Sequence, residues 1–227
     1  MRTFRISAAF VFVWTLVAVP RASASLITVG IGAFPMGSTL TTFSGLALGT
    51  EVNGLTVDAA VGPGGGILFH YSLGDGAVSI GVGPNTTNNI NLPSIVSDPG
   101  ENSGVLTMTF PSLVDTFGYG YALFPLGTVP IPNGTTLSLF NGATSVGSLS
   151  YPATPDPLFR GGFAGVQSTL PFNRVEVTFN TVSAQAFALD NIRRGPAVAA
   201  VPEPTTLVLL GTGVLSMVIR VRARRQR

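Results

Sequence analysis

The sequence predicts an all-β protein, a single β-sandwich of about eleven short strands. Three observations lead to this prediction. Short apolar runs recur between Gly, Pro and Asn residues, several of these runs alternate apolar and polar residues, and no stretch keeps a helical period for three turns. Turn signals about every ten residues are typical of sandwiches and barrels. We favour a sandwich in a jelly-roll-like strand order.

The clearest predicted strand covers residues 174–179, where Val175, Val177 and Phe179 fall on one face. Alternation also predicts strands over residues 104–110 and 117–123. Less regular runs predict strands over residues 26–33, 55–61, 67–73, 77–82, 135–140, 145–150, 159–166 and 186–192. Asn-Gly and Asp-Gly pairs supply the positive φ of tight hairpin turns, which we expect at 53–54, 75–76, 133–134 and 141–142.

The first 24 residues have the order of a secretory signal peptide. Two arginines precede the uncharged run 6–19, and small residues follow it. As a helix this run reaches only about 21 Å, which is short of a hydrocarbon core of about 30 Å, so a membrane span is disfavoured. We predict cleavage between Ala24 and Ser25.

The charges are unevenly distributed along the chain. All twelve basic residues are arginines, and eight of them lie in the two end segments. Residues 25–200 hold four arginines against nine acidic residues, a net charge of −5. We therefore expect no nucleic-acid partner for the body. The chain has no cysteine, so packing alone must stabilise the fold.

The C-terminal segment has three parts. Val201, Pro202, Glu203 and Pro204 precede an uncharged run over residues 205–219, and an arginine-rich tail follows. The run forms at most a short transmembrane helix, of about 22 Å. The basic tail keeps its end cytoplasmic and the body on the periplasmic side of the inner membrane. The tail arginines are Arg220, Arg222, Arg224, Arg225 and Arg227. Residues 196–200 form a linker to the sandwich domain, residues 25–195.

This three-part segment, residues 201–227, resembles the PEP-CTERM sorting signal of exopolysaccharide-producing Gram-negative bacteria. The resemblance implies that an exosortase, a membrane-embedded cysteine protease, is a partner and cuts near the Pro-Glu-Pro motif. The body would then be released or re-attached at the cell surface or in the extracellular matrix. The alternative is a plain membrane anchor in which the motif is incidental.

The body resembles PEP-CTERM ectodomains more loosely, at residues 43–57, 161–166 and 187–192. Such domains are thought to be jelly-roll-like and akin to carbohydrate-binding modules. In related lectin-like modules calcium often ties the last strand to an early loop through carboxylates. The resemblance therefore implies a possible structural calcium at Asp190 and Glu51, and no other cofactor. Alternatively, Asp190 bonds local amides at the end of a strand.

The sequence carries no catalytic signature. His70 is the only histidine, no Gly-x-Ser-x-Gly elbow occurs, and the ten acids have no recognisable catalytic context. Tyr119 and Tyr121 stand two apart on one strand face and could form a platform for sugar rings, or they could belong to the core. We expect a structural or carbohydrate-interacting protein of the biofilm matrix that binds exopolysaccharide. A polysaccharide hydrolase is the alternative.

Overall fold

Eleven strands carry the described part of the chain. The structure is a computed structural model that describes residues 24–58, 65–83, 89–124, 127–156 and 158–196. The strands are β1 (Leu26–Thr28), β2 (Thr39–Thr41), β3 (Thr56–Val57), β4 (Ile67–Tyr71), β5 (Val78–Gly81), β6 (Ser94–Ser97), β7 (Leu106–Phe124), β8 (Ile131–Asn141), β9 (Thr144–Pro155), β10 (Arg160–Phe179) and β11 (Ala186–Pro196). A single 3-10 turn, η1 (Ile31–Ala33), accompanies them in these ranges. The predicted all-β class is confirmed.

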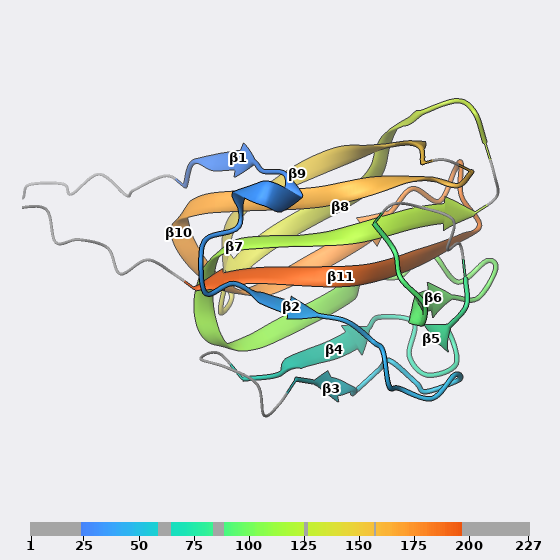
Figure 1. Cartoon of the computed structure of the whole chain (residues 1–227), viewed down its shortest axis with the longest axis horizontal. Helices are drawn as coiled ribbons and strands as arrows, with labels where there is room; N and C mark the ends of the chain where they lie inside the picture. Colours follow the sequence, from blue (N-terminus) through green and yellow to red (C-terminus); the bar gives the residue numbers. More distant parts are fainter. Residues whose placement is uncertain (1–23, 59–64, 84–88, 125–126, 157, 197–227) are drawn as a thin grey trace, which may run out of the picture.

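Two long strands, β7 and β10, belong to both layers of the molecule (Figure 1). The first half of β7 pairs with β4 and with the second half of β10. The second half of β7 pairs with β11 and with the first half of β10. One layer therefore contains β3, β4, β8, β9 and one half of each long strand. The other contains β1, β2, β5, β6, β11 and the remaining halves. The result is a sandwich-like arrangement in which bent strands join the layers.

The prediction of short strands is wrong for β7 and β10, which have 19 and 20 residues. Each long strand runs through a proline, at Pro111 and Pro171, that the sequence pattern treats as a break. The β7–β10 register shifts between Gln167 and Phe172 and again between Phe172 and Arg174. Proline has no N–H to give to a ladder, so it is tolerated where pairing is interrupted and the strand bends.

The hydrophobic core lies between the two layers and is rich in aromatic rings. Tyr71, Phe110, Phe117, Phe172 and Phe187 are all fully buried. The alternation within each strand places these rings on the inner face. With no cysteine in the chain, this packing holds the layers together.

Most predicted strands exist with shifted ends, and two short strands, β2 and β6, were not predicted. Gly54, Gly76 and Gly142 adopt positive φ at the expected turns. The turn expected at Asn133–Gly134 is wrong, because both residues lie inside β8 where its register with β9 shifts. A Cβ at Gly134 would collide with Ala153, so the glycine allows a close approach of two strands instead.

The described chain begins and ends at the same end of the sandwich (Figure 1). We call this the exit end. Pro196, the first residue of the predicted linker, still belongs to β11 and pairs with Val114 at the bend of β7. Phe124, the last residue of β7, lies at the opposite end, which we call the far end. No helix formed by the described residues is long and apolar enough to cross a membrane. The predicted leader up to residue 23, the sorting motif, the 205–219 helix and the arginine tail lie outside the described residues.

Candidate functional site

Tyr119 and Tyr121 are core residues. Their side chains are 0% and 1% exposed, and each hydroxyl bonds inward, to Thr135 Oγ1 at 2.7 Å and to the Pro152 carbonyl at 2.8 Å. Burial raises the pKa of both phenols. A sugar ring cannot stack on a ring that is covered on both faces, so the predicted platform is wrong and core packing, the alternative, is confirmed.

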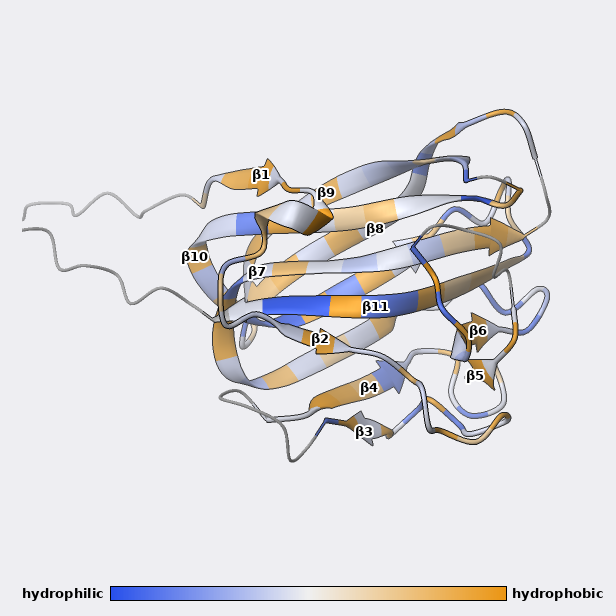
Figure 2. Ribbon diagram, in the orientation of Figure 1, coloured by the Kyte–Doolittle hydropathy of each residue, from blue (hydrophilic) through white to orange (hydrophobic). Residues whose placement is uncertain are grey.

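Asp190 lies on β11 within the polar stretch that Figure 2 colours blue, and its side chain is fully buried. Its Oδ2 accepts the Asn91 N–H at 2.9 Å, while its Oδ1 has no hydrogen-bond partner among the described residues. Burial raises the pKa of Asp190 to about 6, and nearby backbone amides, those of Asn191, Asn91 and Phe43, partly offset this. Asp190 is therefore a buried acid with one oxygen left unsatisfied.

Glu51 has a different set of contacts. Its Oε2 accepts the Gly76 N–H at 3.1 Å, and its backbone bridges to Ser79 of β5. Among the described residues, no hydrogen bond joins Glu51 to Asp190, and no group of three or more His, Asp or Glu side chains is placed to hold a metal ion. The unpaired Oδ1 of Asp190 fits the role of a calcium ligand, whereas the Glu51 carboxylate already bonds the backbone N–H of Gly76. Calcium binding stays a prediction.

His70 is an exposed residue of β4, and its Nδ1 forms a 2.8 Å hydrogen bond with Asn53 Oδ1. Asn53 Oδ1 also accepts the Tyr71 N–H, and Asn53 Nδ2 donates to Asp75 Oδ1 at 2.8 Å. The imidazole thus belongs to a network that ties a loop to β4. The contacts of His70 are therefore structural.

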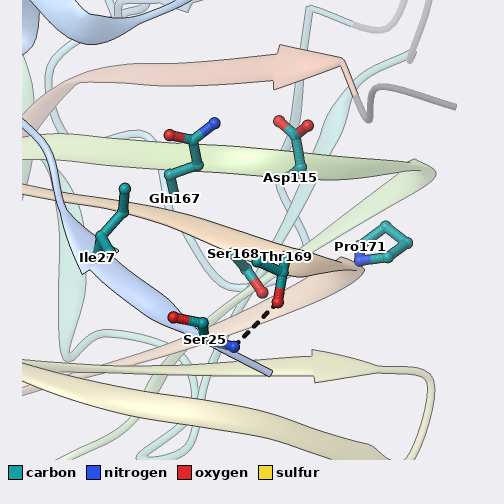
Figure 3. A pocket seen from close by; sticks show the side chains of 7 residues that line it. All are labelled: Ser25, Ile27, Asp115, Gln167, Ser168, Thr169 and Pro171. Carbon is teal, nitrogen blue, oxygen red and sulfur yellow. Dashed lines mark hydrogen bonds between the residues drawn. The ribbon is translucent and has the colours of Figure 1, made fainter. Parts of the chain in front are cut away.

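A pocket of about 470 Å³ opens at the exit end, and we call it the exit-end pocket (Figure 3). It is lined by Ser25, Ile27, Asp115, Gln167, Ser168, Thr169 and Pro171. Ser25, predicted as the first residue after cleavage, lies in its wall and donates its backbone N–H to Thr169 Oγ1 at 2.9 Å. The other walls come from the bends of β7 and β10, which are far apart in sequence, so periodicity could not reveal this pocket.

A second pocket, of about 450 Å³, lies at the far end, and we call it the far-end pocket. It is lined by Val82, Gly83, Val96, Ser97, Asp98, Pro99, Phe124, Phe159 and Ala186. The pairing of Leu123 with Arg160 brings Phe124 beside Phe159, with ring centroids 6.2 Å apart. Phe124 remains 38% exposed. The pocket thus combines a partly exposed aromatic pair with the carboxylate of Asp98 and the hydroxyl of Ser97.

The far-end pocket was not predicted from sequence. Phe124 and Phe159 stand just outside the predicted strands or at their ends, where the alternation stops. The available signal was an aromatic residue within two positions of a proline in each case, Phe124–Pro125 and Pro157–Leu158–Phe159. Strand pairing, which alternation does not reveal, was needed to bring the two together.

Residues 200–225 match the family model described as the PEP-CTERM protein-sorting motif. The chain carries a PEP-CTERM sorting signal. The match covers the segment in which the sequence placed this signal, and it indicates an exported protein that is processed at the membrane. The PEP-CTERM motif is joined to the exit end of the sandwich by the few residues that follow Pro196.

Several solved structures are similar to this chain at low identity and low TM-score. The catalytic domain of a GH87 alpha-1,3-glucanase in complex with nigerose is 12% identical over 76% of this chain and 31% of that domain, with a TM-score of 0.38. A mutant of CBM29-2, a family 29 carbohydrate-binding module, is 12% identical over 59% of this chain and 99% of the module, with a TM-score of 0.31. The CBM22-1–CBM22-2 tandem of Paenibacillus barcinonensis Xyn10C is 12% identical over 82% and 49%, with a TM-score of 0.35.

The PEP-CTERM chain spans less than a third of the glucanase domain that it resembles. At these identities and TM-scores the likeness assigns no role to the body. No curated protein matches the chain. The body's role must therefore be argued from its own residues.

Proposed function

We propose that this chain is a non-enzymatic surface or matrix protein that an exosortase processes at Val201–Pro204. Its leader is removed after Ala24, and a short transmembrane helix over residues 205–219 holds it in the inner membrane until processing. The single observation that carries this proposal is the sorting motif at residues 200–225, joined to a folded sandwich. Loss of the tail would deliver the jelly-roll-like body to the cell surface or to the extracellular matrix of a biofilm.

Polysaccharide is the partner that we propose for the body. The far-end pocket supports this, because Phe124 and Phe159 offer apolar ring surface to the C–H face of a sugar while the Asp98 carboxylate offers hydrogen-bond acceptors to its hydroxyls. Its place at the far end favours such a contact, since the tail leaves from the opposite end. Polysaccharide could then reach the far-end pocket from the side of the sandwich that faces away from the membrane.

Processing is tested by replacing Glu203 with Ala in the producing cell. The expected result is full-length protein retained in the inner membrane, read by immunoblot of membrane and surface fractions, with Glu176→Ala as a control acid in the body. The sorting proposal fails if the Glu203→Ala chain is processed and exported like the parent.

Binding is tested by pull-down on the cell's own exopolysaccharide. The double variant Phe124→Ala/Phe159→Ala should lose at least tenfold in binding while it keeps its fold by circular dichroism. Leu113→Ala is the matched control, because Leu113 is 42% exposed but lies in the β7 bend at the exit end. Equal binding by the double variant and the parent would remove the far-end pocket from the proposal.

A further inference from the structure

Two hydrogen bonds with Thr169 fix Ser25 in the wall of the exit-end pocket (Figure 3). Ser25 N donates to Thr169 Oγ1 at 2.9 Å, and Thr169 N donates back to Ser25 O at 3.1 Å. The next residue, Leu26, pairs with Ser168 and packs against Gly147. These contacts hold position 25 whether or not any residue precedes it.

Cleavage after Ala24 would change the chemistry of this nitrogen. In the precursor it is an amide with one hydrogen. In the mature chain it is an α-amino group, whose ordinary pKa of about 8 makes it an ammonium at neutral pH. The bond to Thr169 uses one of three N–H donors and leaves two for the pocket. No lining residue is basic, so the new ammonium would be the pocket's cation.

The remaining walls suit a hydroxylated ring. Asp115 on β7 and Gln167 on β10 supply a carboxylate and an amide, and both lie on the side of the pocket away from the Ser25 nitrogen in Figure 3. Ile27 is 53% exposed and, with Pro171, provides apolar surface. The volume of about 470 Å³ lies within the range of small-molecule sites.

We infer that leader removal completes, in the exit-end pocket, a binding site for a uronic-acid residue of a polysaccharide. The Ser25 ammonium binds the sugar carboxylate, Asp115 and Gln167 bind hydroxyls, and Ile27 and Pro171 contact the apolar face of the ring. The Asp115 carboxylate also accepts the Thr116 hydroxyl at 2.8 Å, and in Figure 3 it lies on the other side of the pocket from the Ser25 nitrogen. This inference rests on the proposed export and polysaccharide contact, and it adds the class of sugar and the group that selects it.

The sequence supplies a clean test, because the chain contains no lysine. The Ser25 amine is therefore the one primary amine of the mature protein, and an acetylating N-hydroxysuccinimide ester modifies it alone. The acetylated nitrogen keeps one N–H for Thr169, so the fold is retained while the charge is lost. The full chain, extracted in detergent after its own leader has been removed, is compared with and without acetylation.

The probe is a trimer of galacturonic acid, and a neutral maltotriose is its control. Unmodified protein should bind the uronate trimer at pH 6.5 at least tenfold more tightly than maltotriose. Acetylation, or a pH above about 9, should abolish that preference. Gln167→Ala should weaken binding of the uronate trimer several-fold, and Met36→Ala, a fully exposed residue that does not line the pocket, should leave it unchanged.

Equal binding of the uronate trimer before and after acetylation would overturn the inference, as would a mature N-terminus other than Ser25. These results are separable from the proposed function. A chain that ignores the uronate trimer but binds exopolysaccharide through Phe124 and Phe159 fails only this inference. A chain that is not exported or binds no polysaccharide fails the proposed function as well.

Discussion

At the scale of single residues, the sandwich contains glycine positions where the addition of a single Cβ atom should destabilise the fold. Gly120 on β7 is such a position, because a Cβ there would overlap the backbone carbonyl of Asn89. A backbone atom cannot move aside as a flexible side chain can. The neighbour of Gly120 is thus the segment that carries Asn89.

Gly120→Ala is expected to lower the free energy of unfolding by about 2–4 kcal/mol, the cost of displacing that segment or of straining β7. Gly32→Ala is the matched control, since nothing lies within 4 Å of a Cβ at Gly32 and its φ is not positive. Urea unfolding of both variants measures the difference. Equal unfolding midpoints for Gly120→Ala and Gly32→Ala would show that the Asn89 segment leaves room for a side chain at position 120.

Asp190 predicts a pH dependence that runs against the usual behaviour of carboxylates. Its pKa is about 6 in the folded protein and 3.8 as an ordinary value. Between these pH values the folded state keeps a proton that the unfolded state has lost. Stability should therefore fall as pH rises from about 4 to 6, by up to about 3 kcal/mol, and then level off.

The measurement is urea unfolding in buffer with a chelator, for the parent and for Asp190→Asn, which cannot titrate. The Asn variant should lack this fall, and a fall of the same size in the variant would assign it to other groups. Calcium gives a second readout at the same residue. If Asp190 is a ligand, millimolar calcium raises the Tm of the parent at pH 7 and not that of Asp190→Asn, and an unchanged parent Tm removes the calcium prediction.

At the scale of secondary-structure elements, short apolar runs between Gly, Pro and Asn residues predicted most strands. Alternation predicted the clearest three, because the inner face of each of these strands is buried and the outer face is not. It could not show that residues 104–110 and 117–123 belong to one strand, because Pro111 interrupts the pattern where β7 bends. Strands β2 and β6, with three and four residues, are too short to show a period. The burial of Tyr119 and Tyr121 followed from their apolar neighbours, whereas the Phe124–Phe159 pair depended on strand pairing.

Truncation of a buried side chain should destabilise the protein strongly at the bends of β7 and β10. Phe172 is fully buried and pairs with Val114 where both long strands turn between the layers. Phe172→Ala is expected to cost about 3–5 kcal/mol, because it would leave a cavity in the core at the bend. Leu113→Ala, in the same bend of β7 but 42% exposed, should cost less than about 1 kcal/mol. Similar unfolding midpoints for the two variants would contradict this role of the bend.

At the scale of the whole molecule, both ends of the described chain lie at the exit end, and the aromatic pocket lies at the far end (Figure 1). The sandwich therefore separates the part that is sorted from the part that we propose contacts polysaccharide. Six residues lie between Pro196 and Glu203, and the seven Cα–Cα steps from one to the other span at most about 25 Å when fully extended. This short segment thus sets the largest possible distance between the exit end of the sandwich and the cleavage site.

Deletion of residues 197–200 is expected to reduce processing. The two residues left between Pro196 and Glu203 give three Cα–Cα steps, which span at most about 11 Å and bring the sandwich against the protease. Replacement of the same four residues by Gly-Ser-Gly-Ser keeps the length and should restore processing, which distinguishes reach from sequence recognition. The ratio of processed to full-length chain on immunoblots measures both, and unchanged binding to exopolysaccharide shows that the body is folded. If the deletion is processed like the parent, the exosortase reaches its site without clearance from the exit end. If the Gly-Ser chain fails as the deletion does, residues 197–200 are read as part of the signal.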